Sequence, residues 1–392
     1  MIGRQFIGHG NSILGAIINF LFITADQSSR GGTERAVSNL AIMLDEIGGH
    51  QINVLSIRGG ASSFFPMPEG ANLATLNHPK KRWLKQLSLP LEIISAIRNT
   101  GPDVVIAVDS VHFFYLAAAT GLFPKIRFWC WEHFNALSTL GIRRRGLGRR
   151  LASILADAVI VLTTEDRRYW RALFGTSPSR LVVIPNPIPH SSAVASPSED
   201  LSPRDATMDG AQSLPNSCAR KTVLAAGRLE EQKGFDLLLR SWALIPQRNR
   251  AGWLLKIAGE GRLKSELEAL AFELGVRDSV EFLGYVDLSY EMCVSDIFAL
   301  SSRFEGFALV LLEAVSAGLP CVAFSCPSGP KEIVDHGRSG YLVPPGDTVS
   351  FAKRLNGLMQ SDDLRDKFGE YSAISAERFA WPMVRRKWAE LL

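Results

Sequence analysis

Residues 301–318 read SSRFEGFALVLLEAVSAG and join an apolar run at 297–302 to the start of a helical pattern. Gly306 lets the chain turn tightly and brings backbone N–H groups close to a ligand. We expect a helix to begin near Phe307, where free amides and the positive dipole end favour a phosphate. The stretch therefore predicts a strand, a glycine turn and a helix, the repeating unit of a doubly wound α/β fold.

Short apolar runs alternate with longer helical patterns along the rest of the chain. Near-continuous apolar runs suit parallel strands that are covered on both faces. Residues 33–47 show the helical pattern, because Val37, Leu40 and Leu44 recur at helical spacing. The predicted strands lie at residues 17–24, 52–57, 103–109, 126–132, 158–163 and 181–186, and then at 222–228, 253–259, 280–284, 297–302, 320–325 and 340–343.

The alternation of strands and helices occurs twice, and 392 residues are too many for one ordinary core. We therefore expect two Rossmann-like doubly wound domains that face each other across a cleft, with ligands at the carboxyl ends of the strands. The segment after Pro187 is rich in Ser, Pro, Asp and Asn, so it should be a flexible loop. The predicted parts are a first domain (1–187), a linker (188–220), a second domain (221–375), and a C-terminal helix (376–392) that packs back toward the first domain.

Composition describes a soluble globular protein, with 46% hydrophobic and 21% charged residues. A net charge of +4 fits anionic ligands or an anionic membrane surface, and it does not demand nucleic acid. Four of the five cysteines lie in apolar surroundings and none forms a Cys-x-x-Cys pair, which favours a reducing cytoplasm and argues against zinc. The apolar run at 13–23 is too short to span a membrane and lacks a cleavage site, so a buried first strand explains it better than a signal sequence.

Two cations follow the first strand of the second half, in residues 222–236, TVLAAGRLEEQKGFD. Arg228 and Lys233 lie five residues apart in a turn that contains glycines. Two cations at the carboxyl end of a strand can hold a diphosphate and neutralise the charge that grows on it as a leaving group. Taken alone, two solvated surface charges would be the simpler explanation.

Two glutamates flank the predicted helix start after the strand at 297–302. Glu305 comes just before the helix, and Glu313 should lie about two turns into it, roughly 10 Å along the axis. Apolar residues surround Glu313, and a carboxylate buried alone is costly, so it needs a partner. A ribose diol would suit it, and a nearby Arg or Lys is the structural alternative.

Three further segments follow predicted strands. Gly32 lies in a Gly-Gly-Thr-Glu turn at 31–34, which is not the Gly-x-Gly-x-x-Gly fingerprint of dinucleotide binding. Residues 328–332 repeat the glycine turn before a helix, and their amides could contact a sugar or phosphate. His133, in WEHFN at 131–135, could hydrogen-bond sugar hydroxyls, although a lone histidine is often only structural.

Basic residues cluster twice in the first half of the chain. Lysines and arginines mixed with apolar side chains suit an anionic lipid surface, and the alternative is a solvated face. The clusters are Lys80, Lys81, Arg82 and Lys85 around Trp83 and Leu84, and Arg143, Arg144, Arg145, Arg149 and Arg150 around Leu147.

Together these motifs resemble the large family of retaining glycosyltransferases with the GT-B fold. The resemblance covers most of the chain, and its most specific element is the pair of glutamates separated by seven residues, EGFALVLLE at 305–313, with GRLEEQKG upstream. The WEHFN and CPSGPKEI segments look most like bacterial hexosyltransferases that build lipopolysaccharide or exopolysaccharide.

The resemblance implies a role for each matching residue. Arg228 and Lys233 would bind the donor diphosphate without a metal or other cofactor, and Glu313 would bind the ribose hydroxyls. Glu305 and His133 would act beside the donor sugar as catalytic residues. Backbone groups would approach the donor at the Gly32 turn and at Gly306 with Phe307.

The implied activity is transfer of a hexose from a UDP- or GDP-sugar, with retention, to a lipid-linked, lipopolysaccharide or exopolysaccharide acceptor. We expect a cytoplasmic enzyme on the inner membrane, held there by its basic patches, with no nucleic-acid partner. A nucleotide-sugar epimerase on the same fold is an alternative, and so is a non-catalytic protein that binds sugar nucleotides.

Overall fold

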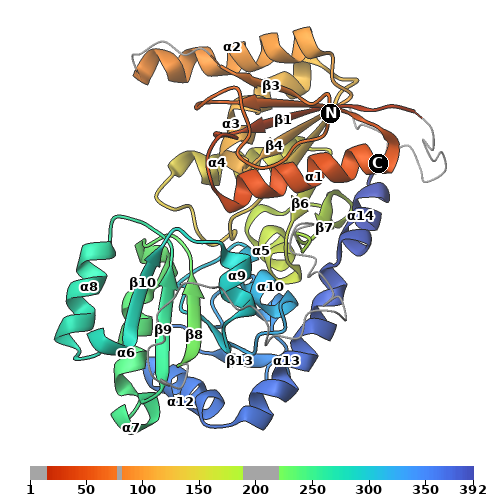
Figure 1. The fold of residues 1–392 in the computed structure, drawn as a ribbon. Helices are drawn as coiled ribbons and strands as arrows, with labels where there is room; N and C mark the ends of the chain where they lie inside the picture. The colour runs from red at the N-terminus through yellow and green to blue at the C-terminus, as the bar shows by residue number, and fades with distance from the viewer. Residues whose placement is uncertain (1–15, 77–81, 189–219) are drawn as a thin grey trace, which may run out of the picture. The chain divides into compact units, whose positions relative to one another are not determined.

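The structure is a computed structural model that describes residues 16–76, 82–188 and 220–392 (Figure 1). The side chains of residues 82–87 lie outside this description. The predicted linker therefore falls almost entirely outside the described residues, as do Cys218 and the side chains of the first basic cluster.

The first sheet has seven strands in the order β3-β2-β1-β4-β5-β6-β7. Strand β1 pairs in parallel with β2 and β4, β2 with β3, and β4 with β5. The strands are β1 (Asn19–Thr24), β2 (Gln51–Ser56), β3 (Asn72–Thr75), β4 (Val104–Val108), β5 (Arg127–Trp131), β6 (Ala158–Val161) and β7 (Leu181–Val183).

The second sheet has six strands in the order β10-β9-β8-β11-β12-β13, all paired in parallel. Its strands are β8 (Lys221–Ala226), β9 (Trp253–Ala258), β10 (Val280–Gly284), β11 (Ile297–Leu300), β12 (Cys321–Phe324) and β13 (Gly340–Val343). In both sheets the strand order reverses beside the first strand, at β1/β4 and at β8/β11. This is the order of a doubly wound Rossmann-like sheet, which confirms the predicted fold class.

Helices connect the parallel strands, as parallel pairing requires. Those of the first half are α1 (Gly32–Gly48), α2 (Arg82–Thr100), α3 (Ser110–Leu122), α4 (Arg143–Leu155) and α5 (Thr164–Phe174). Those of the second half are α6 (Phe235–Leu244), α7 (Gln247–Arg250), α8 (Lys264–Glu273), α9 (Leu288–Cys293), α10 (Leu309–Ser316), α11 (Pro330–Ile333), α12 (Thr348–Met359), α13 (Asp362–Ala376) and α14 (Trp381–Ala389). Within the described ranges, no helix is long and apolar enough to cross a membrane.

The apolar runs form strands because both faces of the sheets are covered. All five residues of β4 and all four of β11 are buried. On one face of the second sheet, Leu255 of β9 lies in the same core as Trp242 of α6 and Phe351 of α12. The sequence did not predict β3, since this short strand has only exposed or half-buried residues and no apolar run.

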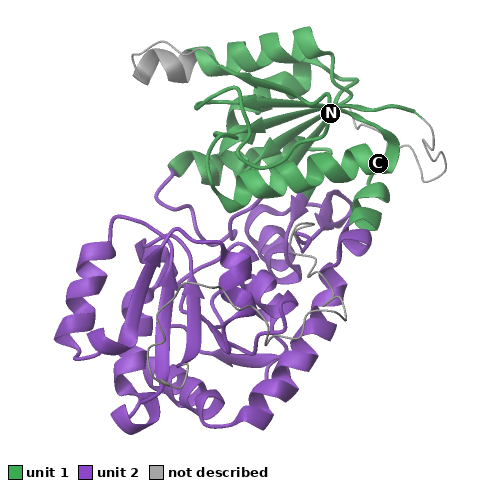
Figure 2. Ribbon diagram, viewed as in Figure 1, with its two compact units in different colours: residues 1–131, 143–159, 385–392 green, residues 132–142, 160–384 purple. Residues whose placement is uncertain are grey.

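The chain packs as two compact units (Figure 2). Unit 1 comprises residues 1–131, 143–159 and 385–392, and unit 2 comprises residues 132–142 and 160–384. In unit 1, Trp388 packs edge-on against Trp131, with ring centroids 5.3 Å apart. The segment that follows β5, residues 132–142, carries His133 and belongs to unit 2 together with the second sheet. The domain limits that the sequence predicted, after residues 187, 220 and 375, remain predictions.

Candidate functional site

The candidate site lies where the second sheet reverses its strand order. Strands β8 and β11 are parallel neighbours, so the segments that follow them leave the sheet at the same edge. In doubly wound folds, ligands bind outside the carboxyl ends of the strands at this reversal. The fold therefore brings the segment with Arg228 and Lys233 beside the segment with Glu305, two motifs about 70 residues apart in the sequence.

Hydrogen bonds tie these two segments together. The Ser301 hydroxyl donates to the Lys233 carbonyl at 2.9 Å, and the Arg303 amide donates to the Gln232 carbonyl at 2.8 Å. Gly234 has φ of 62°, and a Cβ atom there would overlap the Ser301 carbonyl. Glycine at this position thus allows a left-handed turn and a close backbone approach at once.

Lys233 and Glu305 form an ion pair at the centre of the site. The Lys233 ammonium lies 2.7 Å from Glu305 Oε1, and the Ser302 hydroxyl donates to the same oxygen at 2.6 Å. The two side chains are only 16% and 6% exposed, so the pair is largely shielded from water. The sequence predicted both residues but neither their direct contact nor the part played by Ser302.

Cys326 lies two residues after β12, and the charges of Glu305 and Lys233 both act on its thiol. Burial raises the pKa of the Cys326 thiol to about 12, and the Glu305 charge adds to the rise while Lys233 opposes it. The thiol therefore stays protonated and is a poor nucleophile at neutral pH. Cys130 and Cys321 are also buried, whereas Cys293 is exposed.

Three strand-end segments of unit 2 converge at Gly306 and Phe307. A Cβ atom on Gly306 would overlap the His133 carbonyl, and one on Gly329 would lie 2.7 Å from the Phe307 carbonyl oxygen. The Phe307 ring is buried and packs edge-on against Phe379, with centroids 5.6 Å apart. The structure thus brings the His133 backbone next to Gly306, and the roles assigned to both residues at the donor stay predictions. Because the Phe307 ring is part of the core, any contribution it makes to binding comes from its backbone.

Helix α10 begins later than predicted. Ala308 adopts a left-handed conformation, with φ of 68° and ψ of 63°, and cannot belong to the right-handed helix, which starts at Leu309. The prediction of a start near Phe307 was therefore wrong, and Glu313 lies about one turn into the helix instead of two. Glu313 is 7% exposed, in keeping with its apolar surroundings.

Two predicted donor residues are not joined to the ion pair. Arg228 follows β8, and its side chain is exposed and makes no hydrogen bond or ion pair with the part of the chain that the structure describes. Gly32 is exposed at the start of α1, in unit 1. The assignment of both to donor binding stays a prediction.

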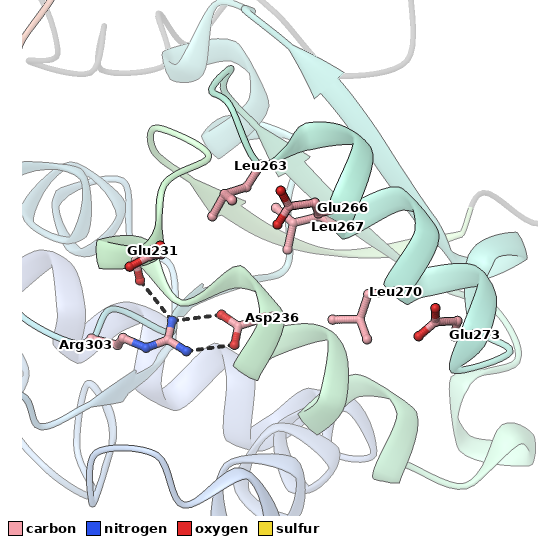
Figure 3. A pocket seen from close by; sticks show the side chains of 8 residues that line it. All are labelled: Glu231, Asp236, Leu263, Glu266, Leu267, Leu270, Glu273 and Arg303. Atoms are coloured by element: carbon pink, nitrogen blue, oxygen red, sulfur yellow. Dashed lines mark hydrogen bonds and ion pairs between the residues drawn. The ribbon is translucent and has the colours of Figure 1, made fainter.

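A cavity of about 350 Å³ lies elsewhere in unit 2, between α6 and α8 (Figure 3). Leucines 263, 267 and 270 line it together with four carboxylates, and Arg303 binds Asp236 through two hydrogen bonds of 2.8 and 2.7 Å. These hydrogen bonds from Arg303 are the largest cause of the lowered pKa of Asp236. None of the predicted site residues lines this cavity, so we do not assign donor binding to it.

The second basic cluster is only partly a surface feature. Arg145 and Arg149 are 3% and 0% exposed, so the expectation that they belong to a membrane-facing patch was wrong. Arg145 instead binds Asp109 after β4, with a 2.8 Å ion pair. Burial raises the pKa of Asp109, but the hydrogen bond and charge of Arg145 outweigh it and hold that pKa below its usual value.

No group of three or more His, Cys, Asp or Glu side chains that could hold a metal ion occurs in residues 16–76, 82–188 and 220–392. The charges gathered at the site are instead those of Lys233 and Glu305. A cation there can bind an anionic group, and a carboxylate can accept hydrogen bonds from hydroxyl groups.

The sequence matches two glycosyltransferase families. Residues 212–374 match the family described as "Glycosyl transferases group 1", and residues 30–192 match "Glycosyltransferase Family 4". An uncharacterized glycosyltransferase of Haemophilus influenzae is 30% identical over 373 residues, which cover 95% of this chain and 99% of the relative. The chain belongs to the glycosyltransferases, and its second half matches the group 1 family. The family resemblance inferred from the motifs is thereby confirmed.

Other similar proteins support the fold. The amylovoran biosynthesis glycosyltransferase AmsD of Erwinia amylovora is 28% identical and matches over 93% of this chain and 97% of its own length. The crystal structure of Anabaena Alr3699/HepE in complex with UDP superposes with a TM-score of 0.75 at 21% identity, over 95% of this chain and 99% of that one. WaaG, described as involved in lipopolysaccharide biosynthesis, superposes with a TM-score of 0.73 at 17% identity, over 95% and 99%. The GT-B fold class is therefore shown for this glycosyltransferase.

Proposed function

We propose that this glycosyltransferase moves a hexose from a UDP- or GDP-sugar, with retention and without a metal, to a lipid-linked or polysaccharide acceptor. The observation that carries the proposal is the shielded Lys233–Glu305 pair at the strand reversal of the second sheet. It combines a cation for a diphosphate with a carboxylate for sugar hydroxyls in one place.

Lys233 and Arg228 divide the binding of the diphosphate between them in this proposal. Lys233 is held in place by Glu305, whereas Arg228 is exposed and free to move onto an incoming anion. A negatively charged leaving group is stabilised most by donors that are already in position. Lys233 therefore supplies the fixed charge, and Arg228 supplies the one that adapts.

The proposed transfer exchanges one bond at the anomeric carbon for another on the same face. The bond from this carbon to the phosphate oxygen breaks, and the bond to the acceptor oxygen forms. The acceptor proton passes to the leaving phosphate. Glu305 and the His133 segment border the sugar in this proposal. They keep its anomeric carbon oriented while the bonds change.

The nature of the acceptor is supported by the relatives. AmsD is named for amylovoran biosynthesis, and a Campylobacter jejuni relative, 25% identical over 95% of this chain, is named for a diphosphoundecaprenol-linked acceptor. We accordingly propose a glycan acceptor of this kind, a cytoplasmic location, and contact with the inner membrane through exposed basic residues.

The test is a transfer assay with UDP-glucose, UDP-galactose, UDP-N-acetylglucosamine and GDP-mannose, using lipid-diphosphate-linked sugars as acceptors. We expect one donor to be consumed, with an α-linked product by NMR, and a rate unchanged by EDTA. An epimerised sugar without transfer would identify the alternative enzyme. Binding without turnover of any donor would support a non-catalytic protein instead.

A further inference from the structure

The turn at Ser328 and Gly329 is held by residues that the proposed mechanism does not use. Both residues have left-handed backbone conformations, with φ of 62° and 71°. A left-handed serine is uncommon and persists only where its surroundings enforce it. Since Gly329 lies against the Phe307 carbonyl, the turn borders the donor segment that follows Glu305.

Two side chains from outside the second sheet enforce this conformation. The Ser328 amide donates to Glu165 Oε2 at 2.9 Å, and the Asn135 side-chain amide donates to the Ser328 hydroxyl at 2.6 Å. Asn135 and Ser328 are 3% and 0% exposed, so little water competes for these bonds. Glu165 comes from the first turn of α5, and Asn135 from the segment that follows β5.

Glu165 is itself fixed in place. The Tyr169 hydroxyl donates to its other oxygen at 3.1 Å, and Lys331 lies 3.4 Å from the same oxygen. Burial raises the pKa of Glu165, but the Ser328 amide, Tyr169 and Lys331 together lower it more, so the carboxylate stays charged. In return, Glu332 accepts a hydrogen bond of 2.7 Å from the Thr164 amide at the start of α5. The start of α5 and the 328–332 segment therefore hold each other.

We propose that Glu165 is a positioning residue for the donor sugar: it fixes the Ser328–Gly329 turn, which in turn fixes the Gly306–Phe307 backbone beside Glu305. This inference rests on the proposed function. The proposed role concerns the sugar and not the diphosphate, because the turn borders the segment assigned to the sugar. Among the described residues, the turn makes no hydrogen bond with Arg228 or Lys233. Loss of Glu165 should weaken binding of the sugar nucleotide and leave binding of the free nucleotide nearly unchanged.

The experiment compares the affinities of UDP-glucose and UDP for the full chain, by calorimetry, in the wild type and in three variants. If the donor screen identifies another sugar nucleotide, that compound and its nucleoside diphosphate replace these probes. Glu165→Ala removes the acceptor of the Ser328 amide, and such bonds to a charged group are strong enough for a loss of about tenfold in sugar-nucleotide affinity. Glu165→Gln keeps an acceptor oxygen and should restore most of this loss.

Glu291→Ala is the matched control, since it removes the 2.9 Å ion pair with Lys256 in the same unit, away from the turn. We expect Glu165→Ala to lower only the sugar-nucleotide affinity, and the control to lower neither affinity. Equal losses for UDP-glucose and UDP, or no loss for either, would overturn the positioning role. A wild type that binds no sugar nucleotide would instead refute the proposed function.

Discussion

At the scale of single residues, Lys233 and Glu305 contribute unequally to stability. Lys233→Ala leaves a carboxylate that is 6% exposed without its cation, whereas Glu305→Ala leaves an ammonium that is 16% exposed on a flexible stem. We expect urea unfolding to show a loss of about 3 kcal/mol for Lys233→Ala and a smaller loss for Glu305→Ala. Both variants should lose transfer activity. A double Lys233→Met, Glu305→Met variant should regain stability while staying inactive, and equal losses in the single variants would contradict this account.

The Asp109–Arg145 pair predicts a pH dependence of stability in unit 1. The folded pKa of Asp109 is lowered, so its stabilising contribution is complete above the unfolded value of about 3.9 and is lost as the pH falls through the folded value. We expect Asp109→Asn to flatten the fall in the free energy of unfolding below about pH 4, measured in urea at several pH values. If the free energy of unfolding of this variant falls with pH as steeply as that of the wild type, other carboxylates cause the loss of stability in acid.

At the scale of elements, Gly234 connects β8 to α6 and sets the spacing between the two site segments. In Gly234→Ala, a left-handed alanine would also overlap the Ser301 carbonyl, which would push Lys233 away from Glu305. We expect sugar-nucleotide binding to be lost, together with more than about 2 kcal/mol of stability. Gly275→Ala is the control, because φ is a similar 66° but a Cβ atom there meets nothing within 4 Å. It should cost about 1 kcal/mol and leave binding intact, and equal effects of the two variants would refute the spacing argument.

The elements also show what the sequence could and could not predict. Each predicted apolar run overlaps a strand, and the signal is clearest for strands such as β4 and β11, whose residues are all buried. Strand β3 left none, since its four residues, NLAT at Asn72–Thr75, contain no apolar run. The start of α10 was placed too early because the left-handed Ala308 looks like any helical alanine in sequence. The Lys233–Glu305 contact depends on the order of the strands in the sheet, and the hydrophobic periodicity of the sequence does not predict this order.

At the scale of the whole molecule, most of the candidate donor residues lie in one compact unit. Arg228, Lys233, Glu305, Glu313 and His133 all belong to unit 2, and Gly32 belongs to unit 1. Proteins with several compact units often unfold in more than one step. We therefore expect calorimetry to resolve two thermal transitions, of which only one depends on a nucleotide bound to unit 2.

UDP tests this division directly. A ligand that binds only the native state stabilises by about 2.7 kcal/mol at a concentration 100 times its Kd, which should raise one of the two transitions by several degrees. Lys233→Ala should remove the shift, and Asp109→Asn, which changes only unit 1, should leave it in place. If both transitions rise together, unit 1 also responds to the nucleotide, as the prediction for Gly32 requires. If only one rises, the assignment of Gly32 to binding of the nucleotide is wrong.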